Sequence, residues 1–386
     1  MGDGTISGRS GATVEPRPAV VRGTTTLGAT MAGQRTRLVY IGSYTSDSNG
    51  GGHGTGISVW RHDPETGELH PAGPDTPVSG PSFLTWHPTG DFLYSVNERP
   101  DGAVTALAVD NGVPRVLGEQ PTGGADPCHL SVDPTGRYLV TANYTSGSVV
   151  VHPIAADGSL GPRSDFVQHQ ARADSADDDA RTAVVKGRQG GPHCHQVRFD
   201  PAGRTLLVND LGTDQVYGYR LDEGRLTPVA VTELSRGTGP RHLVFSGERA
   251  WLAAELASTV SALHYRPETG TVTLVDQVDA TGRHGEAPNY PSEIVLSEDG
   301  RHVYVANRGE NTVAVFDVGP GTLRLAGEVD CGGDWPRHLM LLGDHLYVAN
   351  QRSDAVTVFR LDPDSGLASR AHTVPVPSPA CLLAGR

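Results

Sequence analysis

The chain has 386 residues and a formal net charge of −13, with 49 glycines and 28 prolines. This acidic charge argues against nucleic acid as the main partner, because neutralising phosphates requires a basic surface. No run of about 18 apolar residues occurs, so neither a membrane-spanning helix nor a membrane partner is predicted. Short runs rich in Val, Leu, Tyr and Thr, separated by turn residues, predict an all-β protein.

Residues 1–36 are rich in Gly, Thr and Arg and show neither the helical nor the strand period. They also lack an apolar stretch of signal-peptide length, so we expect a disordered tail. The first strand-like run, RLVYIGSY, begins at Arg37. We therefore predict a tail over 1–36 and one β domain over 37–386.

A repeated unit begins at Pro81. It consists of P-x-x-L, a Pro-x-Gly turn, an apolar triplet ending in Asn, a polar loop and alternating valines. Successive units are 43 to 65 residues apart, a period typical of four-stranded propeller blades. The longest interval contains an insertion at about residues 171–190, with four acidic residues close together. The leading prolines are Pro81, Pro127, Pro192, Pro240, Pro291, Pro336 and Pro379.

The two ends of the repeat region complete one another. Residues 37–73 contain every part of the unit except its opening strand, whereas the C-terminal PACLL contains only that opening strand. Together they make a seventh blade, which closes the ring and removes exposed sheet edges. The predicted fold is a seven-bladed β-propeller with four-stranded blades, closed by pairing of N-terminal strands with a C-terminal strand.

Polar residues recur at two places in the unit that meet on one face. In a propeller blade the first strand lines the central channel, and it starts on the face where the loop between the second and third strands lies. The residues near the start of the first strand are Cys128 and His129, His193 and His195, Arg241 and His242, Ser292 and Glu293, and Arg337 and His338. Those at the end of the second strand include Glu98, Asp210, Glu255 and Arg308.

Structural roles account for some of these residues. Asn97, Asn143, Asn307 and Asn350 end the second strands, where an amide side chain can bond the backbone of a tight loop. His129 and His338 can fill the channel as hydrogen-bonded imidazoles. Buried Arg and Glu are rare unless paired, so Arg241, Glu255 and Arg308 form either a functional set or a structural ion-pair network.

Two sets of residues offer metal-ligand atoms, and neither forms a complete site. His193 and His195 alternate on a strand and could clasp Zn²⁺, but no third ligand follows from the spacing. Oxygen atoms of Glu98, Asn143, Asp210 and Asn307 could imitate a Ca²⁺ site. We predict no metal and no cofactor.

The cysteines form no CxxC pair and no dense framework. They are expected to be reduced, mostly buried thiols of a cytoplasmic protein, without disulfides. The four are Cys128, Cys194, Cys331 and Cys381.

Over residues 37–386 the chain resembles the seven-bladed lactonase family, which contains propeller-type 6-phosphogluconolactonases and fungal carboxy-cis,cis-muconate cyclases. The resemblance rests on PHCHQVRFDPAGRTLLVNDLGTDQV, GPRHLVF and VANRGENTVAVF. It implies an active site composed of His195, Arg241, Glu255 and Arg308, with His193 as the alternative to His195. One departure is Ala254, where family members often have Asn before the Glu.

The resemblance implies a lactone hydrolase, with 6-phospho-D-glucono-1,5-lactone as the expected substrate in carbohydrate metabolism and the pentose phosphate pathway. Hydrolysis needs a base, His195 or Glu255, and a cation at the developing oxyanion, for which Arg241 is suited. The planar fork of Arg308 suits an anionic substituent. Further substrate-binding residues are expected to be His193, Asp210, His242, Glu293, Arg337 and His338.

The residues leave three further alternatives open, two for the function of the protein and one for the insertion. A carboxymuconate cyclase would need the same polyanion-binding groups, and a non-catalytic propeller would use the same rim to bind a protein. The insertion is either a solvated surface loop or a partial lid over the channel. The protein is expected to be a monomer or a weak oligomer that binds a small anionic sugar lactone.

Overall fold

The structure is a computed structural model that describes residues 1–2, 37–172, 188–283, 285, 288–319 and 321–386. Beyond its first two residues the predicted tail lies outside this part, as do residues 173–187 of the insertion. The predictions of a disordered tail and of a lid therefore remain predictions. Among the described residues, no helix is both long and apolar enough to cross a membrane.

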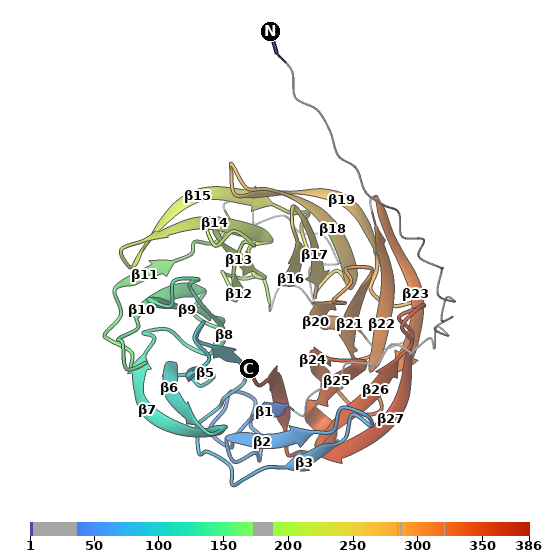
Figure 1. Ribbon diagram of the computed structural model, residues 1–386. Coiled ribbons are helices and arrows are strands. Elements are labelled where there is room, and N and C mark those ends of the chain that lie inside the picture. Colours follow the sequence, from blue (N-terminus) through green and yellow to red (C-terminus); the bar gives the residue numbers. More distant parts are fainter. Residues whose placement is uncertain (3–36, 173–187, 284, 286–287, 320) are drawn as a thin grey trace. The chain divides into compact units, whose positions relative to one another are not determined.

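The described residues from Leu38 onward form seven four-stranded antiparallel sheets around a ring (Figure 1). This arrangement confirms the predicted seven-bladed propeller. From the centre outward, the first blade contains β28 (Pro379–Ala384), β1 (Leu38–Ser43), β2 (Ile57–His62) and β3 (Leu69–Pro71), and the second contains β4 (Leu84–Trp86), β5 (Phe92–Asn97), β6 (Ala103–Asp110) and β7 (Val113–Pro121).

The remaining blades follow the same order from the centre outward. The third contains β8 (Pro127–Val132), β9 (Tyr138–Asn143), β10 (Ser148–Pro153) and β11 (Asp165–Gln168), and the fourth contains β12 (Cys194–Phe199), β13 (Leu206–Asp210), β14 (Gln215–Asp222) and β15 (Arg225–Glu233). The fifth contains β16 (Pro240–Ser246), β17 (Arg249–Ala254), β18 (Thr259–Arg266) and β19 (Thr271–Asp279). The sixth contains β20 (Tyr290–Leu296), β21 (His302–Arg308), β22 (Thr312–Gly319) and β23 (Thr322–Asp330), and the seventh contains β24 (Pro336–Leu342), β25 (His345–Asn350), β26 (Ala355–Leu361) and β27 (Ala368–Pro375).

The ring closes as the sequence predicts. The C-terminal strand β28 pairs antiparallel with β1, from Val39 opposite Ala384 to Ser43 opposite Pro379. The first blade is thus assembled from both ends of the repeat region, and pairing covers the edge that β1 would otherwise expose.

Apolar side chains from facing sheets form the core between neighbouring blades. Trp251 and Val260 of the fifth blade, for example, share a buried cluster with Val305 and Phe316 of the sixth. Since a blade is covered on both faces, its second strand is buried along almost its whole length, and every residue of β21 is buried.

A repeated tyrosine bond ties successive blades together. Tyr40, Tyr94, Tyr304 and Tyr347 each lie on the second strand of a blade and donate a hydrogen bond to a glycine carbonyl of the next blade, over 2.8 to 3.0 Å. A buried hydrogen bond of this kind contributes about 1 kcal/mol. The bonds link the blades at their outer turns while the core packs them along their faces.

The asparagines that end the second strands brace loops, as predicted. Asn307 donates from Nδ2 to the Ala280 carbonyl and to the Thr312 hydroxyl, and Asn350 makes the corresponding bonds to the Cys331 carbonyl and Thr357. Each of these two side chains is therefore bonded to one backbone carbonyl and one threonine hydroxyl.

One-residue bulges interrupt the pairing of first and second strands near one rim. In the fifth blade Pro240 lies opposite Ala254 and His242 opposite Ala253, which leaves Arg241 as the extra residue. A bulge redirects the side chain of its extra residue and commonly lies beside functional sites. The same bulge occurs at Cys128, His195, Arg337 and Ala380.

The register corrects one detail of the sequence repeat. Cys194 lies opposite Asp210, the place that Pro240 takes in the fifth blade. Assigning Pro192 as the leading proline of the fourth blade is therefore wrong by two residues, since two extra residues precede this strand. The residue equivalent to Arg241 is thus His195 and not His193.

Candidate active site

Three arginines surround one buried carboxylate where the fifth and sixth blades meet. Glu255 Oε1 lies 2.7 Å from Arg188 Nη2, and its Oε2 lies 3.1 Å from Arg241 Nε and 2.6 Å from Arg308 Nη2. The contacts of Oε2 are close ion pairs whose angles fall outside hydrogen-bond geometry. We call Arg188, Arg241, Glu255 and Arg308 the arginine cluster.

The fold brings these four residues from separate segments. Arg241 is the bulge residue of β16, and Glu255 directly follows β17. Arg308 ends β21, while Arg188 lies at the end of the inserted segment before β12. Backbone carbonyls help to fix two of them, because Arg241 donates to Ser292 O over 2.6 Å and Arg308 donates to Tyr290 O over 3.2 Å.

The charges of the cluster are strongly coupled. Burial alone would raise the pKa of Glu255, but the guanidinium groups of Arg308, Arg188 and Arg241 outweigh it and lower that pKa to about 2. Burial, together with the neighbouring cation of Arg308, lowers the pKa of Arg241 to about 10. At neutral pH the cluster therefore contains a carboxylate and protonated guanidinium groups.

His195 lies beside the arginine cluster as a neutral imidazole. Burial, followed by the positive charge of Arg241, holds its pKa well below the ordinary value. Its ring is 5.1 Å from the ring of His242 and 5.5 Å from that of Tyr144. Nδ1 of His195 is buried and has no hydrogen-bond partner among the described residues.

A second buried carboxylate is held by imidazoles. Glu293 accepts from His242 Nδ1 over 3.0 Å, and His338 Nε2 lies 3.2 Å from its other oxygen. We call His242, Glu293 and His338 the histidine cluster. Burial lowers the pKa of His338 to about 4 and holds that of His242 well below its ordinary value, so both rings are neutral at pH 7.

Arg337 belongs to a third pair. Its Nη2 lies 3.4 Å from Glu98 Oε2, and its guanidinium carbon lies 4.9 Å from the centre of the Tyr44 ring. The Tyr44 hydroxyl donates to the same carboxylate over 2.8 Å, and Ser82 donates to it as well. Glu98 is therefore surrounded by donors from three blades.

His193 and Asp210 have partners outside both clusters. His193 stacks on Tyr144 with ring centres 4.7 Å apart and donates from Nδ1 to the Tyr144 carbonyl. Asp210 is fully buried, where one oxygen accepts from three backbone N–H groups and the other lies 2.7 Å from His169 Nδ1. These contacts form the loop after β13, so the predicted substrate-binding role of Asp210 finds no free acceptor.

One group of metal-type ligands occurs among the described residues. Atoms of His169, Cys194 and Asp210 lie within 4.8 Å of one another, and all three residues are buried. Their donors and acceptors already bond one another, and Tyr219 bonds the remaining nitrogen of His169. His193 and His195, weighed above as an incomplete zinc pair, have different partners, because His193 bonds Tyr144 while His195 faces His242. All four cysteines are buried free thiols.

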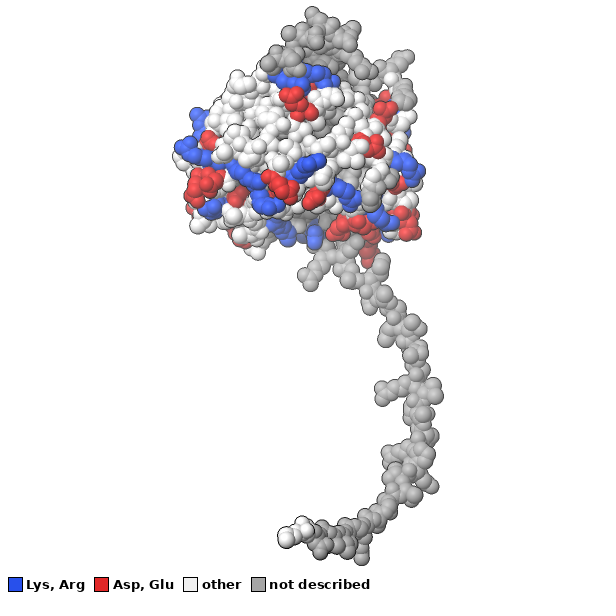
Figure 2. Space-filling model, turned by 90° about the horizontal axis from the view of Figure 1, so that it is seen from above, with Lys and Arg blue, Asp and Glu red and all other residues white. Residues whose placement is uncertain are grey.

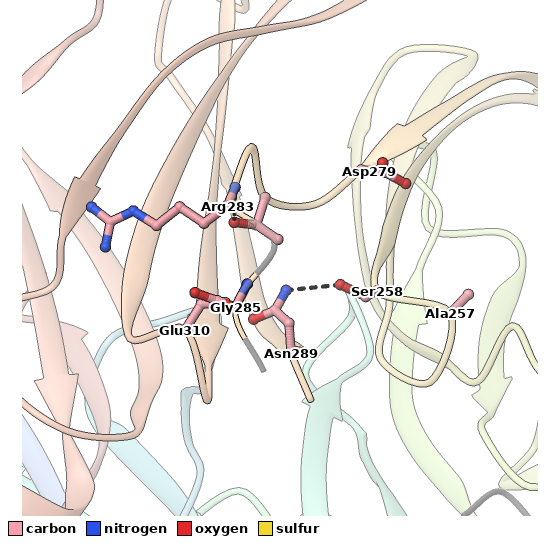
Figure 3. A pocket seen from close by; sticks show the side chains of 8 residues that line it. Ala257, Ser258, Asp279, Arg283, Gly285, Asn289 and Glu310 are labelled. Atoms are coloured by element: carbon pink, nitrogen blue, oxygen red, sulfur yellow. Dashed lines mark hydrogen bonds between the residues drawn. The ribbon is translucent and has the colours of Figure 1, made fainter. Parts of the chain in front are cut away.

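A hollow of about 270 Å³ opens near the loop that follows Glu255 (Figure 3). Asp279, Arg283, Asn289 and Glu310 contribute to its lining, and Asn289 donates to Ser258 Oγ over 2.8 Å. No member of the arginine or histidine cluster lines it. Its charged lining, two carboxylates and one guanidinium, also differs from that of the arginine cluster.

Arg188 is the site residue that sequence reasoning missed. It lies in the insertion and thus outside the repeat from which the other residues were found. It donates from Nε to the Tyr144 hydroxyl over 2.8 Å as well as contacting Glu255. Its sequence position could have identified it, because Arg188 lies five residues before the first histidine of GPHCHQV, on a segment expected to reach the charged rim.

Comparison with known proteins agrees with this architecture. Residues 38–384 match the family model described as "Lactonase, 7-bladed beta-propeller". A 6-phosphogluconolactonase of Bacillus subtilis is 33% identical over 306 residues, which cover 77% of this chain and 83% of that protein.

Two solved structures are similar throughout the propeller. A putative 6-phosphogluconolactonase from Bacteroides fragilis has a TM-score of 0.80 and 34% identity, covering 92% of this chain and 99% of its own. The periplasmic gluconolactonase of Pseudomonas aeruginosa has a TM-score of 0.82 and 32% identity, with coverage of 91% and 99%. The family match spans nearly the whole propeller, and the chain therefore belongs to the seven-bladed β-propeller lactonase family.

Proposed function

We propose that this protein is a lactone hydrolase of the 6-phosphogluconolactonase type, converting 6-phospho-D-glucono-1,5-lactone and water to 6-phosphogluconate. The observation that carries the proposal is the arginine cluster beside the neutral imidazole of His195. Membership of the lactonase family and the names of its relatives support it.

His195 is the general base of this proposal. Its neutral imidazole can take a proton from water while the water oxygen attacks the lactone carbonyl carbon. The ring C–O bond then breaks, and the proton passes to the departing alkoxide oxygen. An anionic substrate offsets the nearby guanidinium charges, which raises the pKa of His195 and makes it a better base.

Glu255 serves as the anchor of the arginines. A carboxylate with a pKa of about 2 and three cationic neighbours is a weak base at neutral pH. Its two oxygens instead orient the guanidinium groups before substrate arrives, so little reorganisation is needed as charge develops. Of the two bases that the residues alone left open, we therefore favour His195.

Arg241 and Arg308 divide the anionic substrate between them. Arg241 stabilises the oxyanion that forms at the carbonyl, and the planar fork of Arg308 holds an anionic substituent. The histidine cluster and Arg337 form the part of the site next to Arg241. His242 directly follows Arg241 in β16. We assign no substrate contact to Asp210, whose oxygens are both occupied.

A cytoplasmic location fits this substrate. A phosphorylated sugar acid is too highly charged to cross a bilayer unaided, and the four cysteines are free thiols. We also propose that the propeller works as a monomer or weak oligomer, since the four groups come from one chain.

Turnover of 6-phosphogluconolactone by the purified protein tests the proposal, with acid release followed above the spontaneous rate. We expect saturable hydrolysis, and His195→Gln should lower kcat by about 10²- to 10⁴-fold. A carboxymuconate assayed in parallel distinguishes the cyclase: its turnover without lactone hydrolysis overturns the proposal. Hydrolysis that His195→Gln leaves intact removes His195 as the base.

A further inference from the structure

We infer that Arg188 is a specificity-determining residue that binds the phosphate of the substrate, so that this side chain selects phosphorylated over unphosphorylated lactones. This inference rests on the proposed function and extends it to a residue outside the blade repeat. It follows from the charge balance of the arginine cluster, the exposure of Arg188 and the way its side chain is held.

The arginine cluster carries more positive than negative charge. Among the described residues, three guanidinium groups share the single carboxylate of Glu255. The next arginine, Arg337, has its own partner in Glu98, and the negative charge of Glu293 acts on a further guanidinium, that of Arg198. About two positive charges are therefore left uncompensated, which matches the roughly −2 charge of a phosphate monoester at neutral pH.

This imbalance differs from the outer surface. On the face drawn in Figure 2, the described Lys and Arg residues are interspersed with Asp and Glu. The protein as a whole is acidic, with a formal net charge of −13. A concentrated cationic site within an acidic protein indicates a specific anionic ligand, because desolvated like charges repel unless an anion joins them.

Arg188 is the most accessible of the three arginines. Its side chain is 39% exposed, compared with 3% for Arg241 and 7% for Arg308. The two buried arginines are fixed by backbone carbonyls and by Glu255. A ligand entering from solvent meets Arg188 first, so this residue suits the outer side of the phosphate that Arg308 holds from within, and Arg241 suits the reacting end.

The guanidinium of Arg188 is also presented in a fixed orientation. Nε donates to the Tyr144 hydroxyl, Nη2 contacts Glu255 Oε1, and its carbon lies 5.7 Å from the centre of the Tyr144 ring. Tyr144 is in turn stacked on His193. This support orients the planar fork, whose remaining N–H groups can bind two phosphate oxygens at once.

Paired kinetics on two substrates test the inference. Wild type, Arg188→Gln and Arg188→Lys are assayed on 6-phosphogluconolactone and on unphosphorylated glucono-1,5-lactone. We expect Arg188→Gln to lower kcat/KM about 10- to 100-fold on the phosphorylated lactone, mainly through KM, and several-fold less on the unphosphorylated one. Arg188→Lys, which keeps the charge without the fork, should fall between.

A matched control is Arg99→Gln. Arg99 is a partly buried arginine on the loop between β5 and β6 of the second blade, paired with Asp101 and Glu119. This variant should behave as wild type on both lactones. Inorganic phosphate should inhibit wild type competitively and inhibit Arg188→Gln at least about tenfold more weakly.

The outcomes separate the two proposals. If wild type hydrolyses neither lactone, the proposed function fails, and calorimetric binding of inorganic phosphate to wild type and Arg188→Gln still tests the anion site. If wild type is active and Arg188→Gln loses equally on both lactones, Arg188 only positions Glu255 and the inference is overturned.

Discussion

Two buried carboxylates in one propeller have opposite surroundings. Glu255 is contacted by three guanidinium groups, whereas Glu293 is contacted by two imidazoles. The contacts diverge at successive residues of β16, because Arg241 reaches Glu255 and His242 reaches Glu293. The arginine cluster keeps excess positive charge at any physiological pH, while the histidine cluster changes its charge on acidification. An anionic substrate is therefore expected at the first cluster, and the second contributes support.

Removing residues 379–386 is expected to destroy both clusters together. The deletion removes β28, exposes the edge of β1 and takes away Leu382, whose N–H lies 3.4 Å from His338 Nδ1. Thermal melting should lose its cooperative transition. Deleting residues 1–30 should leave the melting curve unchanged. Equal melting of the two truncations would show that ring closure contributes little.

Neutralising the carboxylate of each cluster should lower the free energy of unfolding by different amounts. Glu255→Gln leaves three guanidinium groups together without a counter-charge, and we expect a loss of about 3 to 5 kcal/mol in the free energy of unfolding. Glu293→Gln leaves two neutral imidazoles and should cost about 1 kcal/mol. Urea unfolding at pH 7.5 measures both.

Sulfate sharpens this comparison. It should restore more stability to Glu255→Gln than to Glu293→Gln, because only the first variant has an uncompensated cationic site for the anion. The second variant controls for the general stabilising effect of sulfate. Equal stabilisation of both variants would argue against anion binding at the arginine cluster.

Activity should distinguish the neighbouring residues of β16. Arg241→Ala removes the proposed oxyanion contact and should reduce kcat/KM by about 10²- to 10³-fold. Melting should stay within a few degrees, since Glu255 keeps Arg188 and Arg308. His242→Gln should reduce kcat/KM by about tenfold or less. Similar losses for both variants would place His242 in direct contact with the reacting groups.

Acid should weaken the histidine cluster first. Burial lowers the pKa of His338 from 6.5 to about 4, so its stabilising contribution is present above pH 6.5 and is lost as the pH falls toward 4. Glu255, with a pKa of about 2, stays ionised over that range. Between pH 7.5 and 5, His338→Gln should lose about 1 to 2 kcal/mol less stability than wild type. His70→Gln provides a matched substitution at an exposed histidine.

The repeat made most of the fold predictable. Leading prolines, turn glycines and terminal asparagines recur at fixed places, and Gly136 and Gly203 have the positive φ of 75° and 67° that such turns require. The match between the two incomplete ends predicted ring closure. By the same logic the repeat placed Arg241, Glu255 and Arg308 on one rim, where they are now seen in contact.

The sequence by itself determined seven blades, their closure and the group of charged residues at one mouth, since these follow from a periodic pattern in which each unit repeats the same local geometry. Only the tertiary structure decided which charges meet. A one-residue bulge set His195 in the place of Arg241 in the fourth blade, the loop after β13 used both oxygens of Asp210, and the end of an insertion brought Arg188 to Glu255. The register of the bulges and the contacts between blades depend on side-chain packing across the closed ring. This packing does not repeat with the blades, so no periodic pattern in the sequence predicts it.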